Sequence, residues 1–124
     1  MDKKFNDFRD LIVYKKAFEQ GYKVFELSLS FPKEEKYSLT DQIRRAARSV
    51  CGNLAEAYRK RDYPKHFHLK ITDCMGENSE TLVWIDFAKH HNYLSEEKYT
   101  EAVSLNEEIT KLLNICITIR GNLA

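Results

Sequence analysis

A helical repeat of apolar residues between positions 39 and 57 limits the fold of this chain more than any other feature. Apolar side chains recur there every three or four residues, a spacing that gathers them on one stripe of an α-helix. The stripe consists of Leu39, Ile43, Ala46, Ala47, Val50, Leu54 and Ala57. A polar stripe runs beside it, and a basic stripe occupies the far side. Because an ordinary surface helix needs only two faces, the third face requires an explanation.

Two helices are expected in the first half of the chain. The first spans residues 11–31 and ends before Pro32, because a residue that precedes proline resists the α conformation. The second carries the three stripes. It begins after a cap at Ser38, with Asp41 completing a capping box, and ends at about Arg61.

Two more helices follow, and together the four predict the fold class. The third runs to about His91, with Asp62 as its cap and Pro64 in its first turn. The fourth follows a cap at Ser95 and extends to about Asn122. No segment shows the alternation of a β-strand. Four helices joined by short loops predict an all-α fold, an antiparallel up-down-up-down four-helix bundle.

The size and composition of the chain fit one soluble domain. It has 124 residues, of which 43% are hydrophobic and 31% charged. We assign residues 1–124 to a single bundle, with residues 1–10 as an N-terminal arm that docks through Phe5 and Phe8. Apolar runs are too short for a membrane span, and the N-terminus lacks the apolar core of a secretory signal. We therefore expect a cytoplasmic protein that has no membrane partner.

The first and third helices carry apolar residues on more than one side, which is more than a single core requires. A lone bundle would expose the second faces as apolar patches, so we expect a homo-oligomer. The residues assigned to the subunit interface are Val13, Val24, Leu69, Val83, Trp84 and Phe87. The alternative is that the N-terminal arm and the C-terminal tail cover these faces.

Residue patterns typical of catalytic or metal sites are absent from the sequence. Di-iron bundles need a Glu followed three residues later by a His, and no Glu in this chain has one. Phosphate-binding glycine loops, nucleophile elbows and zinc-ligand spacings are also missing. Cys51, Cys74 and Cys116 lie in or beside apolar stripes, where structural thiols are expected. We predict no catalytic residue, no metal and no cofactor, and therefore no enzyme.

The polar stripe of the second helix borders its core stripe. We interpret it as an interhelical hydrogen-bond network that fixes the register of the helices, with Arg45 as a candidate partner of Glu56. The network residues are Gln42, Ser49, Asn53, Glu56 and Glu80. The alternative is that these side chains line a ligand pocket.

Basic residues concentrate in one third of the chain. Residues 38–70 contain eight Lys or Arg and three Asp or Glu, whereas residues 71–124 contain four and nine. Because the planar arginine side chain suits phosphate groups, the basic stripe is a candidate nucleic-acid interface. Its members are Arg44, Arg45, Arg48, Arg59, Lys60, Arg61 and Lys65. The alternative is a solvated face, or salt bridges to the acidic fourth helix of the same or a neighbouring subunit.

Residues 42–57 resemble the signature of a known family. The signature Q-I-R-R-A-x-x-S-I/V-x-x-N-I-A-E-G marks the four-helix-bundle proteins encoded in intervening sequences of bacterial 23S rRNA genes. It is similar to Gln42-Ile43-Arg44-Arg45-Ala46-Ala47-Arg48-Ser49-Val50, followed by Asn53-Leu54-Ala55-Glu56. The first helix, the loop after it and the region around Gly76 and Trp84 also resemble the family. The chain departs from the pattern at Gly52, at Ala57 and at Glu77.

The resemblance implies a homopentamer without enzymatic activity. Relatives of the family include the accessory protein of diversity-generating retroelements, which works with a reverse transcriptase and nucleic acid. By analogy, the expected partners are further copies of the chain, RNA or DNA, and a nucleic-acid enzyme. Our leading hypothesis is a non-enzymatic pentamer that binds RNA. The competing hypothesis is a protein-interaction scaffold that has no nucleic-acid role.

Overall fold

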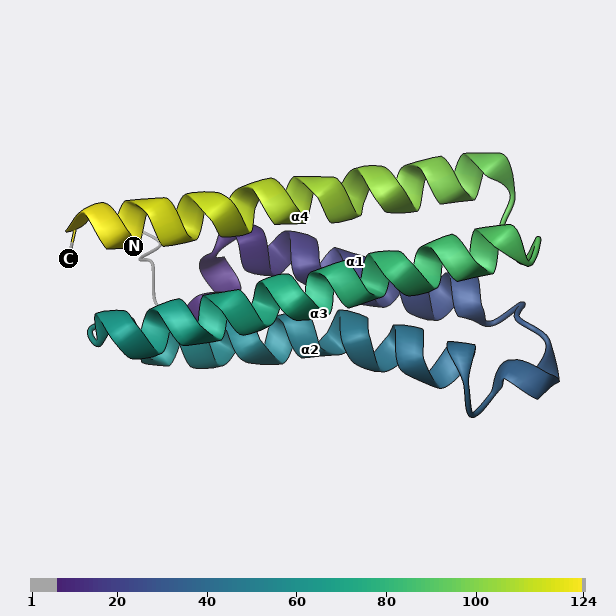
Figure 1. Ribbon diagram of the computed structural model, residues 1–124, viewed down its shortest axis with the longest axis horizontal. Coiled ribbons are helices and arrows are strands. Elements are labelled where there is room, and N and C mark those ends of the chain that lie inside the picture. Colours follow the sequence, from purple (N-terminus) through teal and green to yellow (C-terminus); the bar gives the residue numbers. More distant parts are fainter. Residues whose placement is uncertain (1–6, 124) are drawn as a thin grey trace, which may run out of the picture.

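The computed structural model describes residues 7–123, and the side chains of residues 7–118. Figure 1 shows long helices that lie alongside one another, with consecutive helices running in opposite directions. The helices are α1 Ile12–Ser28, α2 Leu39–Arg59, α3 Pro64–His90 and α4 Glu96–Leu123, and two short 3₁₀ turns lie at Phe8–Asp10 and Lys33–Glu35. No strand occurs among the described residues. The predicted all-α, up-down-up-down bundle is therefore confirmed.

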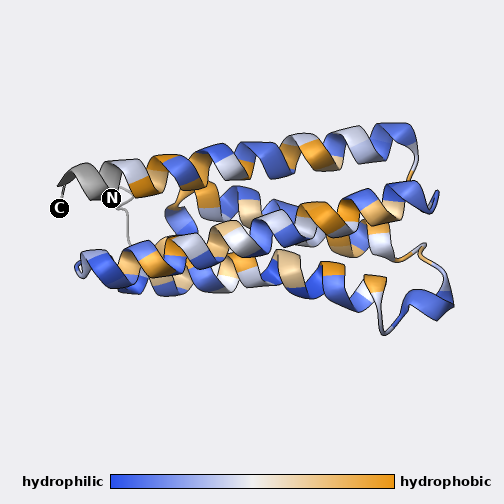
Figure 2. Ribbon diagram, in the orientation of Figure 1, coloured by the Kyte–Doolittle hydropathy of each residue, from blue (hydrophilic) through white to orange (hydrophobic). Residues whose placement is uncertain are grey.

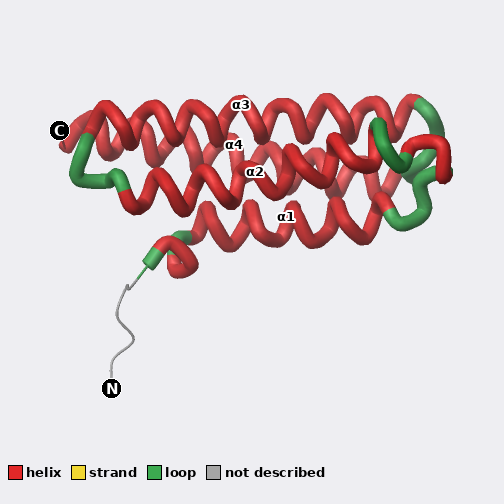
Figure 3. Tube along the Cα trace, turned by 90° about the horizontal axis from the view of Figure 1, so that it is seen from below, coloured by secondary structure: helices red, strands yellow, loops and turns green. Residues whose placement is uncertain are grey.

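The helices occupy the corners of a square in which α1 and α3 are diagonal. α1 packs against α2 and α4, and α3 packs against the same two helices. Viewed at right angles to Figure 1, α1 and α3 form opposite borders of the bundle (Figure 3). The outer surfaces of α1 and α3 therefore face away from each other.

The apolar stripe of α2 lies in the core, as its spacing predicts. All seven of its residues are buried. Six of them belong to two apolar clusters, one with Val50, Leu54 and Ala57 and the other with Leu39, Ile43 and Ala47. Colouring by hydropathy shows apolar segments recurring along each helix, interleaved with polar ones (Figure 2). This interleaving is typical of amphipathic helices in a bundle.

A buried network of amide side chains connects three helices between the two apolar clusters. Gln20 of α1 donates to Asn78 Oδ1 of α3 at 3.0 Å and accepts from Asn106 Nδ2 of α4 at 2.8 Å. Asn106 and Asn78 also bond to each other's backbone carbonyls, at 2.9 and 3.1 Å. Each of the three side chains is at most 2% exposed. Sliding any one helix would leave buried polar groups unpaired, so the network fixes the register of α1, α3 and α4.

Two helix ends differ from the sequence prediction. α1 ends at Ser28, not at Phe31, because the hydroxyls of Ser28 and Ser30 bond back to the carbonyls of Phe25 and Leu27 and the chain turns there. α3 begins after Tyr63 instead of Asp62, although Pro64 does occupy its first turn. Ser95 caps α4 as expected, accepting the Lys98 N–H at 3.1 Å.

The cap of α2 comes from the preceding turn and not from Ser38. Ser38 donates its hydroxyl to Glu35 Oε1 at 2.7 Å, and the same oxygen accepts the Leu39 N–H at 3.3 Å. Glu35 Oε2 accepts the hydroxyl of Tyr93, which lies in the α3–α4 loop. The predicted Ser38–Asp41 capping box is thus wrong, because a carboxylate from the loop supplies the acceptor.

The arm is described from residue 7 onward. Asp7 accepts the N–H of Arg9 and starts the first 3₁₀ turn. The Phe8 ring then packs edge-on against Tyr14, with 5.0 Å between the ring centroids. Docking through Phe8 is therefore confirmed, whereas Phe5 lies outside the described residues.

Replacing Asn106 by Leu should weaken the fold. The substitution leaves Gln20 Oε1 without its partner in the core and costs about 1–3 kcal/mol of unfolding free energy. Urea denaturation followed by circular dichroism measures the loss. Asn114→Leu, an exposed site on the same helix, is the matched control and should change stability by less than about 0.5 kcal/mol. Equal losses in the two variants would contradict the role of the network.

Glu35 should make stability depend on pH in the acid range. Hydrogen bonds from Ser38, Tyr93 and the Leu39 N–H hold its pKa below the ordinary value of 4.5. Its contribution is therefore complete above pH 4.5 and is lost as the pH falls through the folded-state pKa. Glu35→Gln should cost about 0.5–2 kcal/mol at pH 7 and reduce this acid dependence. Thermal melts between neutral and acid pH test it, with Glu34→Gln as the control that should behave like the wild type.

Candidate nucleic-acid interface

The predicted basic residues differ in their surroundings. Arg45 is exposed, with 72% of its side chain accessible, and lies 3.9 Å from Asp41 one turn earlier in α2. Arg48, Arg59, Lys60 and Lys65 are also exposed. Arg44 and Arg61, in contrast, are held against the protein by specific contacts.

Arg44 is anchored on α1. Its Nε donates to Ser28 Oγ at 2.7 Å, and its guanidinium lies 4.5 Å from the centre of the Phe25 ring. Arg48, one turn further along α2, leans over the same ring at 5.8 Å. These two arginines therefore belong to the border between α1 and α2.

Arg61 folds back onto the end of α2. Its guanidinium lies 4.0 Å from the centre of the Tyr58 ring and donates to the Tyr58 carbonyl at 2.8 Å. Positive charge near the last carbonyls of a helix is favourable, so part of this basic group stabilises the helix end.

Three cations at the α2–α3 turn are exposed to solvent, and the charge of Lys60 helps to lower the pKa of Glu56. No described carboxylate lies within ion-pair distance of Arg59, Lys60 or Lys65. We call these three residues the turn cations. They are displayed together because α2 ends at Arg59 and α3 begins at Pro64. The turn lies at the same end of the bundle as the end of α4 (Figure 1).

The residues of the predicted polar network make different contacts from those expected. Asn53 bonds to the Ser49 carbonyl within α2, and Glu80 accepts from Trp84 within α3. Glu56 joins α2 to α3, but through Lys70 at 2.6 Å and not through Arg45. The predicted network residues lie too near the surface to connect the helices through the core. The interhelical network needs deeply buried amides, and those are Gln20, Asn78 and Asn106.

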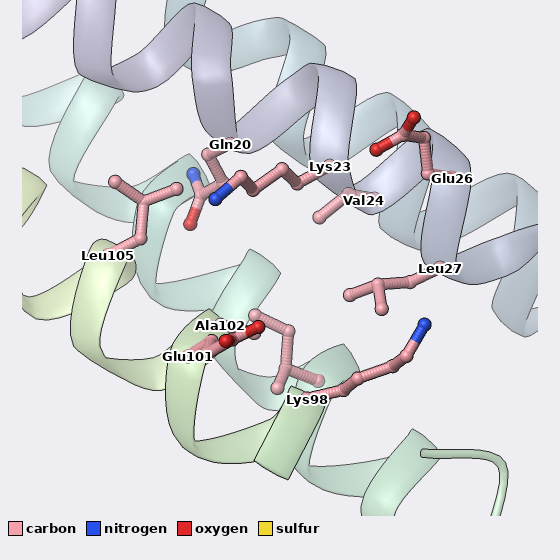
Figure 4. Close-up of a pocket in the computed structure, with 10 residues that line it drawn as sticks. Gln20, Lys23, Val24, Glu26, Leu27, Lys98, Glu101, Ala102 and Leu105 are labelled. Atoms are coloured by element: carbon pink, nitrogen blue, oxygen red, sulfur yellow. The ribbon is translucent and has the colours of Figure 1, made fainter. Parts of the chain in front are cut away.

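The alternative interpretation is that the residues of the polar stripe line a ligand pocket, and only Gln42 lines the hollow at this position. Gln42 lines a shallow hollow together with Trp84, Phe87 and His91, whereas Ser49, Asn53 and Glu56 are not among the residues that line it. A separate hollow of about 190 Å³ opens between α1 and α4. Figure 4 shows Lys23, Glu26, Lys98 and Glu101 around it and Val24, Leu27, Ala102 and Leu105 inside it. Charges of both signs line this hollow, so it favours no single ligand class.

The residues predicted for the subunit interface differ in exposure, and those on α1 are buried in their own chain. Val13 and Val24 are 4% and 2% exposed and belong to the core of their own chain. The apolar residues that α1 exposes are those of its other stripe, including Phe18, Tyr22 and Leu29 at 58–65%. On α3 the predicted residues do reach the surface. Leu69, Val83 and Phe87 are 46–59% exposed, and Trp84 is half-buried.

A hollow on the outer side of α1 went unrecognised in the sequence. It measures about 450 Å³ and is lined by Tyr14, Phe18, Gly21, Tyr22, Phe25, Arg48 and Cys51. The signal was present, because α1 has two apolar stripes and only one can enter the core. The amphipathic pattern alone does not say which of the two stripes is buried.

The three thiols have the character of core groups. Burial raises the pKa of Cys51 to about 11 and that of Cys74 to about 12, so both stay protonated near neutral pH. A protonated thiol is a poor nucleophile. Among residues 7–118, no cluster of His, Cys, Asp or Glu side chains has the arrangement of a metal site. None of the described helices is long and apolar enough to cross a membrane.

Comparison with known proteins gives a family and a structural relative. A sequence model of the 23S rRNA-intervening sequence protein family matches residues 9–115. The chain is also similar to a solved protein of unknown function from the S23 ribosomal protein family of Bacteroides thetaiotaomicron. The two chains are 26% identical, the match covers 86% of this chain and 98% of the other, and the TM-score is 0.77. No curated protein matches the chain.

Proposed function

The chain belongs to the 23S rRNA-intervening sequence protein family, and we propose that it is a non-enzymatic, homo-oligomeric bundle that binds nucleic acid. RNA is the proposed ligand class, and the cytoplasm is the proposed location. The observation that carries the proposal is the cluster of turn cations, which are all exposed and lie together at one end of the bundle.

The turn cations suit a phosphate backbone. Phosphate oxygens accept hydrogen bonds from Arg and Lys, and such contacts hold a nucleic acid in place without reading its sequence. Arg45 lies on the solvent side of α2, about four turns or about 21 Å before Arg59. A backbone that follows α2 can therefore touch both Arg45 and the turn cations. Arg44 and Arg61 are held by contacts within the protein, so we assign them a supporting role and not direct phosphate binding.

Exposed apolar residues support the proposed oligomer. α1 and α3 each present several large apolar side chains to solvent, on opposite corners of the bundle. Monomeric proteins rarely leave such patches uncovered. A pentamer is the proposed state, following the resemblance of the chain to its family. In a ring the turn cations recur once per subunit, so weak phosphate contacts gain strength by multivalency.

A protein-interaction scaffold is the second candidate function. The same exposed apolar residues of α1 and α3 favour it, because they are the kind of surface that protein partners cover. A nucleic-acid enzyme is a suitable partner in either case. Binding to RNA separates the two candidates.

Removing the turn cations should weaken RNA binding. Arg59→Ala with Lys60→Ala should lower affinity for a fluorescein-labelled RNA hairpin by roughly tenfold or more at low salt. It should also reduce the slope of log affinity against log salt by roughly 1 per lost contact. Fluorescence anisotropy over a salt series measures both quantities.

The control removes two cations elsewhere. Lys98→Ala with Lys111→Ala takes the same charge from exposed sites on α4 and should leave the affinity near the wild-type value. If both double variants lose affinity equally, the turn cations are not the binding site. If the wild type binds no hairpin at any salt concentration, the nucleic-acid proposal fails and the scaffold is favoured.

The oligomer is tested on the purified protein. Light scattering coupled to size-exclusion chromatography should give five times the chain mass of 14.6 kDa. A mass of one chain at micromolar concentration would contradict any oligomer, and another multiple would replace the pentamer.

A further inference from the structure

Two exposed faces of the bundle are complementary in charge as well as in apolar character. The first, which we call the aromatic face, lies on the outer side of α1 and along its border with α2. Its exposed residues are Phe18, Tyr22, Phe25 and Leu29, with Arg44 and Arg48 beside them. The second, which we call the α3 face, lies on the diagonal helix. Its residues are Leu69, Val83 and Phe87, with Asp73 and Glu80 between them in sequence.

The aromatic face is a positively charged hollow. The residues that line it include Arg48 and no carboxylate, whereas the hollow between α1 and α4 is lined by charges of both signs, Lys23, Glu26, Lys98 and Glu101. Arg44 adds a second guanidinium over Phe25, and Ser28 holds it in place. Aromatic residues and arginine are enriched at the centres of protein interfaces.

The α3 face has the opposite charge. Asp73 and Glu80 are exposed, and Glu77 lies beside them on α3. Burial raises the pKa of Glu77, and the negative charges of Glu80 and Asp73 raise it further, while the positive charge of Arg45 lowers it. Lys70, 3.6 Å from Asp73, offsets part of this negative charge within the chain, and the approach of a positive surface offsets the remainder. The exposed apolar residues Leu69 and Val83 lie at either end of the group.

From this juxtaposition we infer that the aromatic face of one protomer receives the α3 face of the next protomer, head to tail. The inference rests on the proposed homo-oligomer and names the two surfaces that build it. Each protomer then uses both faces, so the assembly covers both apolar patches at once. Contact of either face with its own copy would bring like charges together.

The positions of the two faces also favour a head-to-tail ring. They lie on α1 and α3, the diagonal helices, so one chain cannot cover its own α3 face with its own aromatic face. The hollow is lined by residues of both α1 and α2, and it therefore opens to the side of α1 that adjoins α2. The two faces are not directly opposite, so repeated contacts turn by a constant angle and can close.

This pairing divides the arginines of α2 by role. Arg44 and Arg48 lie at the subunit contact, beside the aromatic face. Arg59 and Lys60 lie at the end of the bundle and stay free for nucleic acid, whereas Lys65 lies one turn before Leu69 of the α3 face. The basic stripe of α2 then has two parts, one at the subunit contact and one available to nucleic acid.

Mixing two assembly-deficient variants tests the pairing. The first is Phe18→Asp with Tyr22→Asp, which places carboxylates on the aromatic face. The second is Leu69→Asp with Val83→Asp, which does the same on the α3 face. Each alone should sediment at the chain mass of 14.6 kDa, because each lacks one of the two complementary surfaces. A mixture should form a one-to-one complex of twice that mass, because one intact aromatic face meets one intact α3 face.

Analytical ultracentrifugation over a concentration series gives these masses, and circular dichroism checks that each variant keeps its helices. Arg59→Ala with Lys60→Ala should keep the wild-type mass. A mixture that stays monomeric at all concentrations overturns the pairing. So does either face variant if it keeps the wild-type mass. If the wild type itself is a monomer, the proposed oligomer fails, which is a distinct result.

Discussion

The buried hydrogen bonds among Gln20, Asn78 and Asn106 are the constraint on which the rest of the bundle depends. Apolar side chains alone would let four helices slide past one another, since one methyl group packs nearly as well as the next. The three amides accept few alternatives, because any shift strands a polar group inside the core. The register that they set determines which residues of neighbouring helices lie level with one another.

Basic residues concentrate in residues 38–70 and acidic residues in residues 71–124, and the fold places these segments on different sides of the bundle. α2 and the turn after it bring cations to one border and one end of the bundle, while α3 brings carboxylates to the opposite corner. Few of these charges neutralise each other inside one chain. Lys70 and Arg45 are exceptions. Lys70 pairs with Glu56, which ties α2 to α3, and also with Asp73, while Arg45 lies 3.9 Å from Asp41. The remaining charges are left for contacts with other molecules.

The sequence predicted most of the fold because helical spacing is a local signal. The core stripe from Leu39 to Ala57, the helix count and the cap at Ser95 all depend on residues within a few positions of each other. The amide network does not, since Gln20 and Asn106 are 86 residues apart and meet only after the helices pack. The cap from Glu35 was missed because the acceptor lies in a loop. Val13 and Val24 were assigned to the interface because both stripes of α1 are apolar, and burial alone tells them apart.

The contact between Glu35 and Tyr93 makes the two ends of the bundle unlike each other. It ties the α1–α2 loop to the α3–α4 loop, so that end is closed by a hydrogen-bonded clasp. The opposite end carries the α2–α3 turn together with the start of α1 and the end of α4 (Figure 1). A fusion partner or affinity tag joined beyond α4 therefore stands beside the turn cations. A fluorophore placed at Tyr37, whose side chain is 84% exposed, stands at the clasped end and reports on the protein from a distance.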